Sequence, residues 1–255
     1  MSNNSWEKIF SDYEILNHNF DESPFPLTAQ QIKVSCQNFK RTTEKEVRIL
    51  CKHDSRENLP KIMADNGLFL LPVKNGEYVI VKGQGFFDIP NISGEPIDYP
   101  ASKLAFIPTT SFVGNSEMQH VDYAYAISII RTFLDDDSLV LTVRGRKYTP
   151  QFSFRVGKQT ITTKSVQTEV DAGYEGKYKF VIVEAKNSET TNTIIRQLFY
   201  PYRQWSAHLN TEHKEVVLVF FEKRESDYLL WRYKFKDKND YNSIELVSSA
   251  KYRVV

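Results

Sequence analysis

The stretch EVDAGYEGKYKFVIVEAKN, residues 169–187, decides the expected fold and the expected site. Its apolar run FVIV predicts a buried strand, and the alternation of side chains places Glu184 and Lys186, which follow that run, on the same side of the strand. Asp171 ends the preceding strand-like run, and a glycine-containing turn separates the two runs. If the two strands pair as a hairpin, two carboxylates and an ammonium group meet at one edge, which is typical of a functional site.

The runs on either side of this stretch predict an α/β domain with a mixed central sheet flanked by helices. The first helix is expected to begin with a capping box, in which Ser116 is followed three residues later by Gln119. In chain order the expected elements are a helix over 116–134, strands over 138–146, 152–156, 161–170 and 179–185, a helix over 191–205, and strands over 215–221 and 228–235.

The N-terminal part predicts a separate helical unit that ends in a hairpin. Asn75-Gly76 between two apolar runs is a strong signal for a two-residue hairpin turn. Helices followed by a hairpin resemble a winged helix, so this unit is expected to recognise DNA. The alternative is a small helical domain that packs on its neighbour without touching DNA. A proline-rich connector divides the chain into residues 1–90, the connector 91–112, and the core 113–255.

Composition excludes several classes of protein. Lys and Arg number 33 against 32 for Asp and Glu, so a charge-dominated chain is excluded and any nucleic-acid surface is expected to be a local patch. No apolar run is long enough to span a membrane and the N-terminus has no signal pattern, so a cytoplasmic protein is expected. The two cysteines, Cys36 and Cys51, have no metal-binding spacing.

The spacing of Asp171, Glu184 and Lys186 resembles the PD-(D/E)XK nuclease superfamily, and more narrowly its type II restriction endonucleases, over residues 116–235. The resemblance implies a restriction endonuclease-like core. It also implies that the two acidic residues hold Mg²⁺ and that Lys186 positions or helps to deprotonate the attacking water. The chain departs from the pattern at Val170, where the family often has proline.

Two more residues extend this resemblance. Gln197, in the expected helix after the motif, resembles the glutamine of a helix found in several of these nucleases. Glu117, near the start of the 116–134 helix, resembles an upstream glutamate that adds a metal ligand in part of the superfamily. Each residue also has a structural interpretation. In that interpretation Gln197 only belongs to an amphipathic helix, and Glu117 only compensates the dipole of its own helix.

Charge distribution favours a phosphate-binding surface between residues 138 and 168, a segment that contains no Asp or Glu. An exposed basic hairpin without a ligand is the alternative. The expected helix after the motif adds two arginines. The predicted DNA-binding residues are Arg144, Arg146, Lys147, Arg155, Lys158, Lys164, Arg196 and Arg203.

These features together predict a Mg²⁺-dependent, sequence-specific endonuclease that acts on double-stranded DNA. Because the chain holds one copy of the motif, a homodimer is expected, with the apolar strands 216–221 and 228–235 as candidate interface. Two alternatives remain open, a repair or recombination nuclease of the same fold and a non-catalytic DNA-binding regulator.

Overall fold

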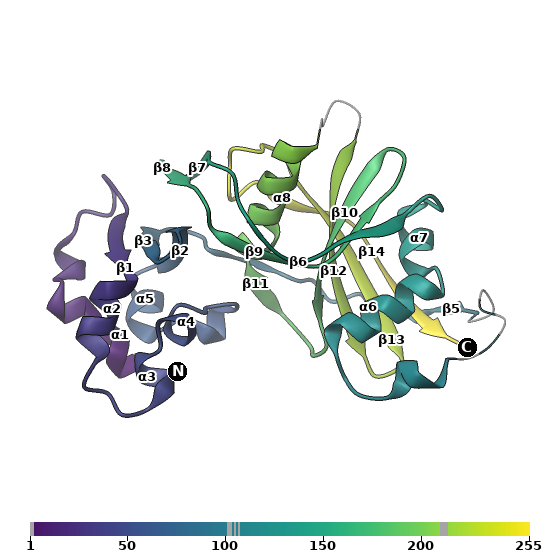
Figure 1. Cartoon of the computed structure of the whole chain (residues 1–255), viewed down its shortest axis with the longest axis horizontal. Coiled ribbons are helices and arrows are strands. Elements are labelled where there is room, and N and C mark those ends of the chain that lie inside the picture. The colour runs from purple at the N-terminus through teal and green to yellow at the C-terminus, as the bar shows by residue number, and fades with distance from the viewer. Residues whose placement is uncertain (1–2, 101–103, 105, 107, 210–213) are drawn as a thin grey trace.

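The central feature is a mixed sheet whose strand order is β5-β14-β13-β12-β10-β9-β6 (Figure 1). The computed structural model describes residues 3–100, 104, 106, 108–209 and 214–255. The β10–β12 and β14–β5 pairs are parallel and the other neighbours are antiparallel. The strands are β5 (Ile97–Tyr99), β14 (Ile244–Val254), β13 (Asp227–Phe235), β12 (Glu215–Arg224), β10 (Lys179–Lys186), β9 (Gln167–Glu175) and β6 (Val140–Tyr148).

Helices cover the two faces of this sheet, as the mixed α/β prediction requires. On one face α6 (Glu117–Ala126) and α7 (Ile129–Leu134) pack against alternate residues of β10, among them Val181 and Val183. On the other face α8 (Arg196–His208) packs against Phe180 and Ile182. Because side chains alternate along a strand, Glu184 and Lys186 continue the row that faces α8.

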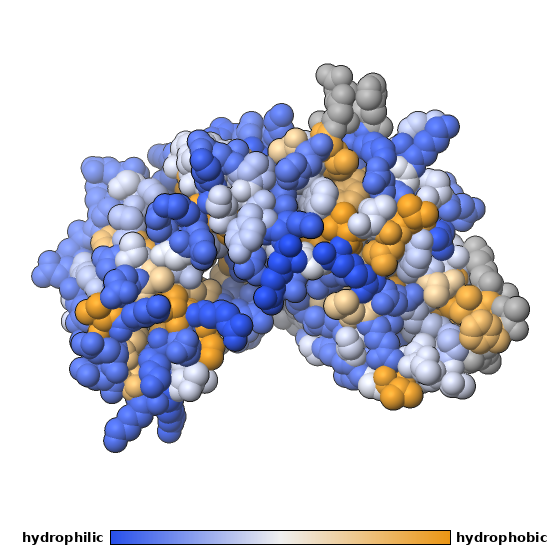
Figure 2. Space-filling model, in the orientation of Figure 1, coloured by the Kyte–Doolittle hydropathy of each residue, from blue (hydrophilic) through white to orange (hydrophobic). Residues whose placement is uncertain are grey.

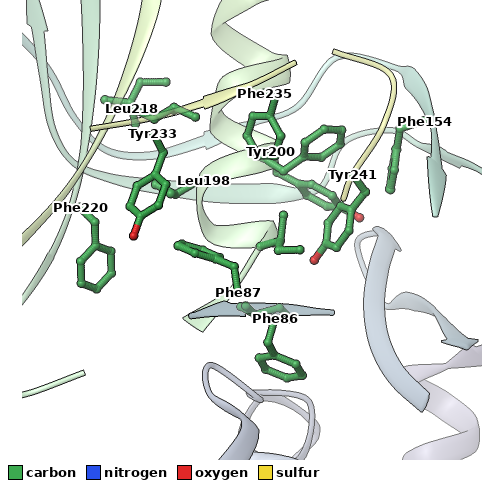
Figure 3. Close-up of a cluster of buried hydrophobic side chains, with 14 of the residues drawn as sticks. Phe86, Phe87, Phe154, Leu198, Tyr200, Leu218, Phe220, Tyr233, Phe235 and Tyr241 are labelled. Atoms are coloured by element: carbon green, nitrogen blue, oxygen red, sulfur yellow. The ribbon is translucent and has the colours of Figure 1, made fainter. Parts of the chain in front are cut away.

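The core beneath α8 is rich in aromatic side chains (Figure 3). Phe87 of β4 (Phe86–Asp88) makes an edge contact with Tyr233, at 5.0 Å between ring centroids. Short strand β4 pairs with β11 (Asn192–Ile194), which lies directly before α8. Segments far apart in the chain therefore fix the position of the helix that follows the motif.

The N-terminal unit contains short helices and a three-stranded sheet of order β1-β3-β2. The expected hairpin is confirmed, with Gly76 at φ 77° in its turn. Two short helices, and not one longer helix, occupy residues 42–50. The elements are α1 (Asn3–Asp12), η1 (Ile15–Asn17), β1 (Phe25–Thr28), α2 (Ala29–Cys36), α3 (Thr42–Lys45), α4 (Val47–Leu50), η2 (Arg56–Asn58), α5 (Lys61–Asp65), β2 (Leu68–Lys74) and β3 (Glu77–Lys82).

The β2–β3 hairpin belongs to two cores at once. On one face Leu70 and Ile80 pack with the N-terminal helices, and on the other Leu71 and Val81 pack with the aromatic core beneath α8. The hydroxyl of Tyr200 also donates a hydrogen bond to the carbonyl of Pro72, at 2.9 Å. The hairpin is thus the joint between the two units and does not project freely like the wing of a winged helix.

The expected capping box at Ser116 is wrong. The Ser116 side chain makes no capping hydrogen bond, and the amide of Gln119 instead donates to the carbonyls of Thr110 (2.9 Å) and Val113 (2.7 Å). Those carbonyls come from the short helix η4 (Thr109–Phe112) and the residue after it. The expected single helix is also broken, since Ser128 adopts a left-handed conformation, φ 70°, between α6 and α7.

Several strand predictions also need correction. The run 161–170 divides into β8 (Gln159–Thr163), which pairs with β7 (Phe152–Val156), and β9, so Asp171 lies inside a strand and not at its end. The expected connector 91–112 contains β5, and its residues 101–103, 105 and 107 lie outside the described residues. Strand β14 was not predicted. It flanks β13, so the apolar runs of β12 and β13 are buried inside the sheet and are not an exposed interface.

Among the described residues, no helix is both long enough and apolar enough to cross a membrane.

Candidate active site

A β-bulge in β9 sets the direction of the Asp171 side chain. The pairing of β6 with β9 passes from Val143–Gly173 to Gly145–Val170, so the two strands advance by different numbers of residues across this interval. Val170 belongs to the core beneath α8, whereas Ala172 belongs to the core beneath α6, so the regular alternation is interrupted at Asp171. Bulges of this kind redirect side chains, and they are common beside active sites.

The redirected carboxylate completes the pairing of β9 with β10. The described backbone register between these strands ends at Val183 opposite Ala172. Just beyond that pair, Asp171 Oδ2 accepts a hydrogen bond from the backbone N–H of Ala185 at 2.7 Å. Burial raises the pKa of Asp171, although this hydrogen bond and the Lys186 ammonium oppose the rise. One oxygen of Asp171 is therefore held by the fold, which leaves the other oxygen for a ligand.

Glu184 and Lys186 form a buried ion pair beside Asp171. Lys186 Nζ lies 2.5 Å from Glu184 Oε1 and 3.0 Å from the carbonyl of Ala185. Burial raises the pKa of Glu184 to about 7 against the pull of Lys186, and the Asp171 charge adds to the rise. Burial alone would lower the pKa of Lys186, but the carboxylates of Glu184, Glu117 and Asp171 raise it above its usual range. Because burial disfavours the charged form of Glu184, a cation bound beside this carboxylate would stabilise it.

These side chains open onto a polar cavity of about 1000 Å³. Its lining includes Asp171, Glu184 and Lys186 together with Gln197 from α8 and Glu117 from α6. The five residues that the motif predicted for catalysis or metal binding thus share one cavity. Figure 2 shows the molecule hollowed between the N-terminal unit and the part that carries the large sheet, and the cavity is lined by residues of both.

Sequence reasoning missed the contribution of the N-terminal unit to this cavity. Asp54 lines it, and its charge helps to raise the pKa of Glu184. The carbonyl of Asp54 accepts hydrogen bonds from the backbone N–H of Ile194 (3.0 Å) and the hydroxyl of Thr193 (3.2 Å). The backbone N–H of Arg56 donates to the side chain of Asn192 at 2.7 Å. Hydrogen bonds to β11 therefore hold this part of the N-terminal unit close to β10, the strand that carries Glu184 and Lys186.

Several predicted DNA-binding arginines are engaged with other groups of the protein. The guanidinium of Arg203 lies 4.7 Å from the centre of the Phe152 ring and donates to two backbone carbonyls. Other arginines of the set have carboxylate partners, which are Asp122 for Arg144, Glu169 (3.4 Å) for Arg146 and Asp237 (2.8 Å) for Arg155.

The other predicted DNA-binding residues are dispersed. Arg196 opens α8, lines the cavity and lies 3.8 Å from Asp54. Lys147 is exposed on the edge strand β6. Lys158 and Lys164 are exposed at the turn and the end of the β7–β8 hairpin and do not line the cavity. The acid-free segment therefore does not form one continuous surface around the candidate site.

The chemistry of the donor groups fits Mg²⁺. Asp171 and Glu184 supply carboxylate oxygens, the ligands that this ion prefers, and burial raises the pKa of each carboxyl. No group of three or more described His, Cys, Asp or Glu residues is arranged as a ready-made metal site. Two carboxylates are nonetheless a usual protein contribution for Mg²⁺, which retains waters and binds substrate phosphate.

Comparisons with known proteins divide the chain in two. Residues 81–253 match the family described as "Domain of unknown function (DUF6997)", and residues 3–80 match the one described as "Domain of unknown function (DUF6996)". No curated protein and no solved structure matches the chain. The motif residues Asp171, Glu184 and Lys186 fall within the first match, whereas Asp54 falls within the second.

Proposed function

We propose that this chain, which belongs to the DUF6997 family, is a Mg²⁺-dependent endonuclease that cuts double-stranded DNA at a specific sequence, as type II restriction enzymes do. One observation carries the proposal. Asp171, Glu184 and Lys186 line a single polar cavity, and their charges are coupled through buried contacts. A surface ion-pair cluster would be solvated and would not shift the pKa of Glu184 to about 7.

The fold is compatible with the restriction endonuclease-like core that the motif implies. The motif residues lie on adjacent antiparallel strands of a mixed sheet with helices on both faces. The helix that carries Gln197 follows the motif strand, and Glu117 approaches from the opposite layer. These placements support the proposed reaction because substrate, metal ligands and polar side chains would meet in one cavity.

In this proposal the acidic residues hold the metal and Lys186 prepares the nucleophile. Asp171 and Glu184 would bind Mg²⁺, with Glu117 near enough for its charge to help raise the pKa of Lys186. Bound there, the ion supplies charge neutralisation at the scissile phosphate and a more acidic water. The Lys186 ammonium would exchange its contact with Glu184 for a hydrogen bond that orients the attacking water, and Gln197 would hold the phosphate or that water.

Cleavage of both strands in one binding event calls for two copies of the site. The sequence has one Asp171/Glu184/Lys186 constellation, so a homodimer on a palindromic site is part of the proposal. Sedimentation with a specific duplex tests this, since two chains per duplex are expected and a single chain that nicks one strand contradicts it.

The enzyme activity is tested with plasmid DNA and purified protein. Mg²⁺ should yield discrete fragments, whereas EDTA should yield none. The Lys186→Met variant, prepared in the same way, should leave nearly all of the plasmid uncut over the time in which the wild type cuts it completely. Cutting only of damaged or branched DNA would favour a repair or recombination nuclease, and binding without metal-dependent cutting by the wild type would favour a regulator.

A further inference from the structure

A second cavity continues the catalytic one along the N-terminal unit. Its volume is about 930 Å³, and it lies between the α3–α4 region and the strands β6 and β9. The two cavities share four lining residues, Lys52, Asp54, Asn58 and Glu169. They therefore form one continuous groove that leads from Lys186 to Arg41.

The N-terminal side of this groove is basic. Arg41, Arg48 and Lys52, which we call the basic wall, line the second cavity and are exposed. In the part of the chain that the structure describes, neither arginine side chain has an ion-pair or hydrogen-bond partner. Lys52 Nζ lies 3.4 Å from Asp54, and its side chain is 72% exposed. Glu44 lies on the same side and offsets one of these charges.

The arginines on the opposite side of the groove each have a carboxylate partner. Arg146 lies 3.4 Å from Glu169, and Arg196 lies 3.8 Å from Asp54. Within the described residues, the arginine side chains of the groove that have no partner therefore lie on its N-terminal side. They lie outside the acid-free segment 138–168, from which a phosphate-binding surface was expected. An arginine guanidinium presents a planar fork of donors that matches phosphate oxygens, which makes it well suited to bind a nucleic-acid backbone.

The basic wall is held at a fixed place relative to the catalytic cavity. The segment that follows Lys52 is bonded to β11 through the carbonyl of Asp54 and the backbone N–H of Arg56. The hairpin that a winged helix would use for DNA is packed into the joint between the units. The N-terminal unit therefore presents α3 and α4, and not its hairpin, to the groove.

We propose that the basic wall binds backbone phosphates of the DNA whose scissile bond lies in the catalytic cavity. The inference rests on the proposed endonuclease function and adds a role for the N-terminal unit, which acts as a phosphate clamp without reading bases. Because phosphate contacts carry no sequence information, its contribution is the same for cognate and unrelated duplexes.

The test measures DNA binding without cleavage, in the Asp171→Asn background with Ca²⁺. Arg41→Ala with Arg48→Ala should weaken binding to cognate and unrelated duplexes alike. The slope of log affinity against log salt should become shallower by about 0.9 for each phosphate that the variant no longer binds, or roughly 1.8 for two phosphates. Thermal unfolding should be unchanged, because neither arginine side chain has a partner within the described residues.

A matched control removes the same charge elsewhere on the same unit. Lys33→Ala with Lys61→Ala alters α2 and α5 at exposed positions that line neither cavity, and it should leave the slope near the parental value. If the wall variant keeps the parental slope, or if the control changes it as much, the clamp is refuted while plasmid cutting by the wild type still supports the endonuclease. If the wild type neither binds nor cuts DNA, the proposed function fails and the clamp fails with it.

Discussion

Replacing Asp171 by alanine and by asparagine separates its two roles. Both variants remove the carboxylate charge, so both should reduce metal-dependent cleavage to background. They differ in the hydrogen bond to the N–H of Ala185, which asparagine can accept through its side-chain oxygen and alanine cannot. Ala185 is fully buried, so alanine leaves a buried donor without an acceptor.

The expected difference in stability follows from that donor. An unsatisfied buried N–H costs about 1–3 kcal/mol, and a destabilisation of about 2 kcal/mol lowers the Tm of a chain of this size by roughly 4–8 °C. Asp171→Asn should be at least as stable as the wild type, because it keeps the hydrogen bond and removes a charge that burial disfavours. Differential scanning calorimetry and plasmid cleavage on the same preparations measure both effects.

Two results would refute this reasoning. Cleavage by Asp171→Asn at the wild-type rate would remove Asp171 from the metal-binding site. Equal Tm values for the alanine and asparagine variants would show that the bulge does not depend on the bond to Ala185. Glu175→Gln, at the far end of the same strand, is the control, and its partly exposed pair with Lys214 predicts about 1 kcal/mol of change or less.

Three further predictions concern catalysis, packing and pH. Lys186→Met should slow cleavage by about 100-fold or more while Ca²⁺-supported DNA binding persists in a filter assay, and wild-type cleavage would contradict its role. Gly173→Ala should destabilise the protein by about 1–3 kcal/mol in urea unfolding, because its new Cβ would lie 2.8 Å from Val143 Cβ; unchanged stability would show that the bulge relaxes. Burial lowers the pKa of His53 from 6.5 to about 4, so the contribution of this residue to the free energy of unfolding should fall by up to about 3 kcal/mol as the pH drops through that interval, while Glu184, whose pKa is raised to about 7, contributes in the opposite direction. The difference in the free energy of unfolding between the wild type and His53→Gln should change by that amount across the interval, and a constant difference would show that His53 does not titrate there.

The motif hairpin could be predicted because its signals are local. An apolar run followed by Glu184 and Lys186 specifies both a strand and the side that it presents, and β9 does pair with β10 as expected. The bulge at Asp171 could not be predicted in this way. It depends on the register between β9 and β6, where Gly145 faces Val170, and that register is a property of two strands and not of either sequence alone.

Other differences between prediction and structure also arise from contacts between residues that are far apart in the sequence. Asp54 has no sequence pattern that marks it, because its place in the cavity comes from hydrogen bonds to β11. Strand β14 has the polar centre SSAK, which hid its strand character, although it pairs along most of β13. Unless β14 is known, the sequence predicts that the apolar runs of β12 and β13 are exposed, whereas both lie inside the sheet.

The hairpin shared by two cores limits how this protein can be altered by recombination. The boundary between the two family matches falls between Ile80 and Val81, neighbours in β3 whose side chains enter different cores. Exchanging the N-terminal unit for a foreign one at that boundary would leave Phe69 and Leu71 out of the core that they complete in the other unit. Chimaeras that keep residues 68–82 with the C-terminal unit should therefore fold where chimaeras cut at the boundary do not.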